Sequence, residues 1–252
     1  MIRQDQIGFS QRIRLDWLEY TANLVLAGNS RDDITAALDD RLREKLSVGQ
    51  NPERGNRAKA ITILTKVWVS PPSELRTLRD EGLDSLRRLA PNNRILLHWC
   101  MCAAVYPFFG IVADSTGRLL RLQGSAAAVQ VQRRLRERLG ERETVARAAR
   151  RILRGFVDWG VLLETEDKGI YRNAARRPVD DTPLAIWAIK AVLTAQANKP
   201  QSAGFLLSGP HLFPFNIGIP STRDLEADED IEITRHGLNH DVLLVLAQAT
   251  PP

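Results

Sequence analysis

Hydrophobic side chains recur at helical spacing along most of the chain. The clearest case is residues 143–157, where the apolar positions advance in alternating steps of three and one. This spacing is typical of a helix with one buried face and does not fit a strand. The apolar positions of this stretch are Val145, Ala148, Ala149, Ile152, Leu153, Phe156 and Val157.

The N-terminal third has the same periodicity. It predicts helices over 10–28, 30–46, 57–69 and 73–90, although the β-branched residues of 57–69 leave a strand open there. Ser30 is a candidate N-cap, and Gly28 stands where a left-handed residue would end the first helix. This region is therefore expected to be a bundle of helices.

An apolar run over 95–113 approaches the length of about 20 residues that a membrane span requires. It contains His98 and Pro107, and a proline interrupts a helix. We expect a buried core helix that ends near Pro107, with His98 as a core histidine and no membrane span. A further helix is expected to continue through 117–123.

The next fifty residues predict a winged helix-turn-helix. A helix over 125–139, with Ser125 as candidate N-cap, ends at Gly140, and the helix at 143–157 follows after a short turn. Two β-prone segments then flank a turn with Gly169 at its exit. In a winged helix-turn-helix the second helix of the pair enters the major groove and the hairpin reaches adjacent backbone.

The C-terminal part has a mixed pattern. A helix is expected within 179–196, with Asp181 or Thr182 as N-cap and Pro183 in its first turn. Residues 198–222 are rich in Pro and Gly and predict an irregular segment that packs through Phe205, Phe213 and Phe215. A strand-like piece and an apolar tail close the chain.

These elements predict a mainly α-helical protein of three parts. They are a helical N-terminal domain (1–105), a basic winged helix-turn-helix-like element (106–177) and an acidic, small mixed C-terminal region (178–252). The length of 252 residues and the hydrophobic content of 44% suffice for a sizeable core.

Charge is distributed unevenly along the chain. The net charge is +5, but residues 118–177 hold fifteen Lys and Arg against seven Asp and Glu, whereas 178–252 hold four against nine. A basic block of this kind is the electrostatic signature of a partner that carries negative charge.

The arginines of the helix at 143–157 are the main candidate binding residues. Arg147, Arg151 and Arg154 lie at i, i+4 and i+7 opposite the apolar stripe, with Arg150 alongside. Guanidinium groups bind phosphate and the guanine edge. The prediction is sequence-tolerant binding of double-stranded DNA, with Arg150 and Arg133 helping at the edge and Lys168 and Arg172 acting from the wing. The alternative is an interaction scaffold that docks its basic face on an acidic partner or on the acidic tail of a second copy, which would give a homo-oligomer.

The sequence gives weaker evidence for metal binding, cofactor binding and catalysis. His236 and His240 have i, i+4 spacing beside Asp241, but no third metal ligand is identifiable. No phosphate-binding loop or dinucleotide fingerprint occurs. We therefore expect no metal, no cofactor and no enzymatic activity. Cys100 and Cys102, two residues apart on a helix, are badly placed to pair, which suits a reducing cytoplasm.

Two resemblances add to this interpretation. The sequence "RETVARAARRIL" followed by "WGVLLETEDKGIYRN" resembles the winged-helix segment of GntR-type bacterial regulators. Across the chain, "GNRAKAITILTKVWV", "ETVARAARRILRGFVDWGVL", "LFPF" and "IEITRHGLNHDVLLVL" resemble the BrxA-like proteins of bacteriophage-exclusion (BREX) systems. The second resemblance implies a helical, non-enzymatic cytoplasmic protein that binds DNA and works beside other phage-defence proteins.

Overall fold

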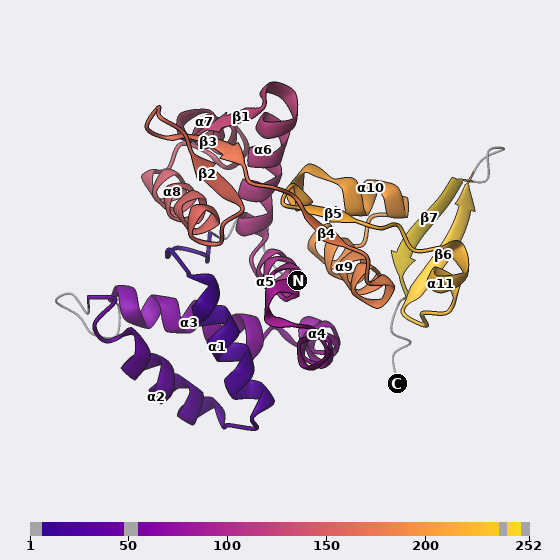
Figure 1. The fold of residues 1–252 in the computed structure, drawn as a ribbon, viewed down its shortest axis with the longest axis horizontal. Coiled ribbons are helices and arrows are strands. Elements are labelled where there is room, and N and C mark those ends of the chain that lie inside the picture. The colour runs from indigo at the N-terminus through magenta and orange to yellow at the C-terminus, as the bar shows by residue number, and fades with distance from the viewer. Residues whose placement is uncertain (1–6, 48–54, 237–240, 248–252) are drawn as a thin grey trace.

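The computed structural model describes residues 7–47, 55–236 and 241–247, and it is mainly helical (Figure 1). The N-terminal helices are α1 (Leu15–Leu26), α2 (Arg31–Leu42), α3 (Asn56–Trp68), α4 (Arg76–Arg88) and α5 (Ile95–Val105). Ser30 caps α2 as expected, since its hydroxyl accepts a 3.2 Å hydrogen bond from the Asp33 amide. Residues 57–69 are helical rather than extended, so the predicted bundle is confirmed.

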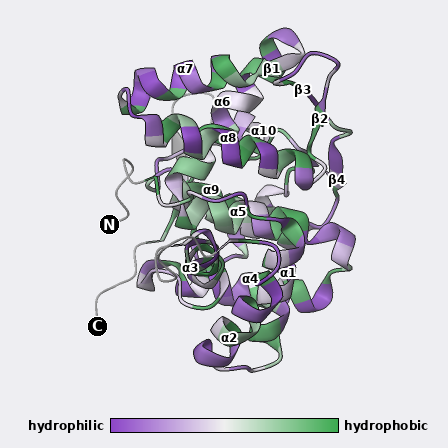
Figure 2. Ribbon diagram, turned by 90° about the vertical axis from the view of Figure 1, so that its left-hand side faces the viewer, coloured by the Kyte–Doolittle hydropathy of each residue, from purple (hydrophilic) through white to green (hydrophobic). Residues whose placement is uncertain are grey.

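Helix α5 lies at the middle of the molecule, between the N-terminal helices and α9 (Thr182–Ala195) (Figure 1). Every side chain of α5 except Ala103 is buried, and both α5 and α9 are largely hydrophobic in Figure 2. The chain turns by 117° between α5 and α6 (Pro107–Gln123). A core helix that ends just before Pro107 is thus confirmed. No single described helix is long and apolar enough to cross a membrane, although the bent pair of 91–105 and 107–123 reaches the required length and composition together.

Helix α6 opens the winged-helix-like element. It is followed by β1 (Ser125–Ala127), α7 (Ala128–Leu139), α8 (Glu143–Asp158), β2 (Leu162–Glu164) and β3 (Ile170–Asn173). The three strands form an antiparallel sheet in the order β1-β3-β2, and Gly169 precedes β3 with a φ of 83°. The order helix, strand, helix, helix, hairpin agrees with the winged helix-turn-helix expected from the sequence, and the assignment to that class stays a prediction.

One local prediction in this element is wrong. Ser125 does not cap α7, because residues 125–127 form a strand instead of the first helical turn. The backbone of this segment pairs with β3, with Ser125 opposite Arg172, and the Ala128 amide donates to the Gly169 carbonyl at 2.8 Å. Helix α7 therefore starts three residues later than the hydrophobic pattern suggests.

The C-terminal region contains more regular structure than expected. Strand β4 (Arg177–Val179) pairs in parallel with β5 (Phe215–Ile217), and α10 (Ala203–Ser208) lies between them in sequence. Residues 198–222 are therefore not simply irregular: Ser202 caps α10, and β4 supplies hydrogen-bond partners for β5.

The aromatic residues and the end of the chain also differ in part from the prediction. Phe213 and Phe215 are buried, but Phe205 is 55% exposed. The strand-like piece and the apolar tail form one antiparallel hairpin, β6 (Ile231–His236) and β7 (Asp241–Leu246). This hairpin follows the short helix α11 (Thr222–Glu226) in the sequence.

Trp99 on α5 joins the three parts of the chain. Its ring lies within 6 Å of aromatic rings from α6, α8 and the C-terminal region, with centroid distances of 5.1 Å to Phe109, 4.6 Å to Phe156 and 5.9 Å to Phe215. The buried hydrophobic residues form one continuous core. The domain boundaries at 105 and 177 stay a prediction.

Candidate nucleic-acid interface

Helix α8 has one buried face and one basic face. The apolar stripe predicted from sequence is buried, with Val157 half-buried at its edge. On the opposite face Arg147, Arg150 and Arg154 are exposed. Arg147 pairs with Glu143 one turn earlier at 2.6 Å, and Arg154 lies 3.3 Å from Glu164 on β2. Hydrogen bonding by Arg147 lowers the pKa of the Glu143 carboxyl.

A segment without regular secondary structure, residues 7–14, lies along one flank of α8, and we call it the N-terminal strap. Arg12 binds Asp158 through two hydrogen bonds, and Trp159 donates from Nε1 to the Ile13 carbonyl at 2.9 Å. Arg151 donates to the Ser10 carbonyl and is half-buried. Of the four predicted α8 arginines, Arg151 is therefore occupied by the protein's own backbone, and the other three remain exposed.

Helix α7 extends the basic surface. Arg133 is exposed and pairs with Glu137 at 2.9 Å. Arg136 and Arg150 are exposed, and the side chain of neither makes an ion pair or hydrogen bond with another described residue. Sequence reasoning did not select Arg136, although its position three residues after Arg133 places it on the same outward face of the helix.

The wing, formed by β2, β3 and the turn between them, carries both charge signs. Lys168 and Arg172 are exposed on it as expected. Glu164, Glu166 and Asp167 are exposed there too. With more carboxylates than cations, the wing favours phosphate contact less than α7 and α8 do.

Several carboxylates of the acidic C-terminal stretch are held by partners within the chain. The Lys190 ammonium on α9 is buried and lies 2.8 Å from Glu81, 3.2 Å from Asp228 and 3.1 Å from Asp230. Asp224 completes a capping box with Ser221 at the start of α11. These carboxylates have partners within the chain, which leaves fewer of them for the basic face of another copy.

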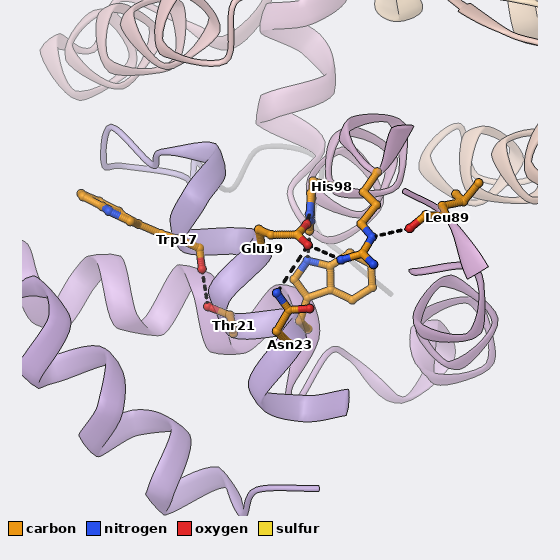
Figure 3. Close-up of polar contacts among 8 residues, drawn as sticks. Trp17, Glu19, Thr21, Asn23, Leu89 and His98 are labelled. Carbon is orange, nitrogen blue, oxygen red and sulfur yellow. Dashed lines mark hydrogen bonds and ion pairs between the residues drawn. The ribbon is translucent and has the colours of Figure 1, made fainter. Parts of the chain in front are cut away.

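His98 is a core histidine, and Figure 3 shows its contact with Glu19. It is 1% exposed, its Nδ1 accepts a 3.0 Å hydrogen bond from Trp68 Nε1, and its Nε2 lies 2.8 Å from Glu19 Oε2. Because the indole N–H is donor only, the imidazole is neutral and Nε2 is the donor to Glu19. Burial lowers the pKa of His98. Both nitrogens are occupied, so His98 has no free position for proton transfer.

The remaining candidates from the sequence are the pair His236 and His240 and the two cysteines. In the described parts of the chain, no cluster of three His, Cys, Asp or Glu side chains has the geometry to hold a metal ion. The His236 side chain and residue His240 lie outside what the structure describes. Cys100 and Cys102 are buried, unpaired thiols, and burial raises the pKa of Cys100.

Comparison of the chain with protein-family models, with curated proteins and with solved structures gives no match. The resemblances to GntR-type regulators and to BrxA-like proteins stay predictions.

Proposed function

We propose that the protein binds double-stranded DNA, with the exposed face of α8 in the major groove and α7 against the backbone. The observation that carries the proposal is the position of Arg147, Arg150 and Arg154. They are exposed together on the second helix of a helix-turn-helix pair, beside a wing, within the most basic block of the chain.

The contacts are mainly to phosphate. Arg147 and Arg154 each have a nearby carboxylate, whereas Arg150 and Arg136 have no ion pair among the described residues and are ready to bind an anion. Arg133 lies one turn from Arg136 and adds to the backbone contacts. Phosphate contacts hold the protein on DNA without reading its sequence, so binding is sequence-tolerant.

The strap determines which part of α8 enters the groove. It covers the flank that carries Arg151 and Asp158, near the C-terminal end of the helix. Recognition helices contact base edges chiefly through their N-terminal residues. The exposed first turns of α8, from Glu143 to Arg150, are therefore the part that approaches the bases.

The test is a salt titration of binding to random duplex, measured by fluorescence anisotropy. The variant Arg147→Gln/Arg150→Gln/Arg154→Gln removes three cations from α8. Each lost phosphate contact reduces the slope of log K against log salt by about 0.9, so we expect a slope smaller by up to about 2.7.

A matched control removes three exposed arginines far from α8, Arg31 and Arg43 at the ends of α2 and Arg87 on α4 (Figure 1). Arg43 and Arg87 are in helical ion pairs, as Arg147 is. The control lowers the net charge by the same amount and should keep the wild-type slope. Equal slopes for wild type and the α8 variant, or equal losses for variant and control, would refute the proposed face.

The alternative is a scaffold whose basic face docks on an acidic protein or on a second copy. The internal partners of Asp224, Asp228 and Asp230 argue against docking between copies. A scaffold that self-associates would show a mass that rises with concentration in light scattering, and the α8 variant would abolish that rise.

A place in phage defence follows from the BrxA-like resemblance alone and extends the proposal. Under it, the DNA-binding protein works beside other proteins of a bacteriophage-exclusion system. Phage plating on cells that carry the whole system, with wild-type protein or the α8 variant, tests this role. Unchanged phage resistance with a variant that no longer binds DNA would separate defence from DNA binding.

A further inference from the structure

A cavity of about 360 Å³ lies between α5, α6, α9 and the segment 199–212. It is distinct from the basic face of α8, although the last turn of α7 contributes Arg138 to its rim. Its volume lies in the lower part of the range of small-molecule sites, about 300–1,000 Å³.

The floor of the cavity is apolar and the rim is charged. Trp99, Ala103, Ile111 and Val192 belong to the floor. At the rim three cations, Arg118, Arg138 and Lys199, lie with one carboxylate, Asp114. Asp114 is already bound by Arg118 at 2.8 Å, so positive charge is left in excess.

His211 supplies an unsatisfied polar atom in the wall. Its Nε2 is buried and has no hydrogen-bond partner in the described structure. Burial lowers the pKa of His211 to about 4, so the ring is neutral near pH 7. The His211 ring therefore lines the cavity without adding charge, and the positive charge of the site comes from the rim cations.

We propose that this cavity binds a small organic anion, with an apolar body on the Trp99 floor and a carboxylate or phosphate group between Arg118, Arg138 and Lys199. The apolar floor excludes a fully hydrated inorganic ion as the best occupant, and the excess of cations selects anions over neutral molecules of the same shape. This inference does not depend on DNA binding.

The experiment uses the full chain and four probes that share a phenyl ring and differ in the polar group. They are phenylacetate, phenyl phosphate, neutral phenylacetamide and cationic phenethylamine. Binding is measured by isothermal titration and by the rise of the unfolding temperature with probe concentration. We expect at least one anion to bind at least tenfold more tightly than the amide or the amine. Which anion binds better distinguishes a carboxylate ligand from a phosphate ester.

Two variants localise the binding, and a third serves as the control. Arg138→Gln/Lys199→Gln removes two rim cations and should weaken anion binding at least tenfold, whereas Arg31→Gln/Lys45→Gln removes two exposed cations outside the cavity and should not. Ala103→Leu fills the floor and should abolish binding. Its unfolding temperature without probe shows that the protein still folds.

Three results would overturn the inference. The first is that neither phenylacetate nor phenyl phosphate binds. The second is that the anions and phenylacetamide bind equally tightly. The third is that the rim variant binds the anion with wild-type affinity.

Discussion

Replacing Gly117 by alanine tests the contact that joins the winged-helix-like element to the C-terminal region. Gly117 lies in α6, where its Cα faces the 3-10 turn η4 (Pro210–Leu212). A Cβ there would lie 1.9 Å from the Pro210 carbonyl oxygen and 3.1 Å from Phe213 Cβ. In an exposed helix the same substitution stabilises by about 0.5–1 kcal/mol, so the packed contact should reverse the sign.

The magnitude follows from how far η4 has to move. To bring the Cβ–oxygen separation to 3.0 Å, the Pro210 carbonyl must shift by about 1.1 Å. The neighbouring His211 carbonyl accepts the 3.0 Å hydrogen bond of Trp99 Nε1, which such a shift disrupts. Overpacking costs about 1–3 kcal/mol and a buried donor left unpaired about 1–3 kcal/mol more. After the helix-propensity gain, we expect a net loss of about 3 kcal/mol.

The assay is thermal unfolding followed by far-UV circular dichroism. At about 2–4 °C per kcal/mol for a chain of this size, Gly117→Ala should lower the midpoint by about 6–12 °C. Gly110→Ala in the same helix is the matched control, because its Cβ would meet only Ala103 Cβ, at an ordinary 3.7 Å. It should leave the midpoint unchanged or raise it slightly. If both variants unfold at the wild-type temperature, the close approach of α6 and η4 is not present in solution.

Two further predictions concern buried charge. Burial alone would raise the pKa of Glu19, but hydrogen bonds from His98 and Arg94 outweigh it and lower the pKa to about 2, from an ordinary 4.5. The stabilisation by Glu19 is therefore present above pH 4.5 and lost as the pH falls toward 2, so urea unfolding should show a steeper acid loss for wild type than for Glu19→Gln. Lys190→Met leaves Glu81, Asp228 and Asp230 without their cation and should cost at least about 2 kcal/mol at pH 7. That cost should shrink in acid, where the carboxylates are protonated, and a constant cost between pH 7 and pH 4 would contradict it.

Amphipathic helices such as α4 and α8 were predictable because each buries a periodic apolar stripe. Residues 143–157 specify α8 by local spacing, and Ser30 and Asp181 mark the starts of α2 and α9 through caps that act within three residues. The strands were less predictable, since β1 and β5 are three residues long and depend on partners distant in sequence. Nothing local in Ser125–Ala127 distinguishes a strand from a first helical turn.

The candidate interface also has a part that local sequence predicts and a part that it does not. Exposure of Arg147, Arg150 and Arg154 follows from their place opposite the stripe, which the sequence contains. The engagement of Arg151 does not, because its acceptor is a backbone carbonyl 141 positions away. Long-range contacts of this kind leave no periodic signal, and for that reason the strap was not foreseen.

The strap also affects the order in which the chain can fold. Arg12 and Ile13 find their partners Asp158 and Trp159 only after 146 further residues have been made. At a synthesis rate of about 5–20 residues per second, that interval is about 7–30 s. During this time the flank of α8 that holds Arg12 and Ile13 does not yet exist, and α1 to α5 must hold together without these contacts. The strap can therefore dock on α8 only late in folding, after α8 has been made and packed.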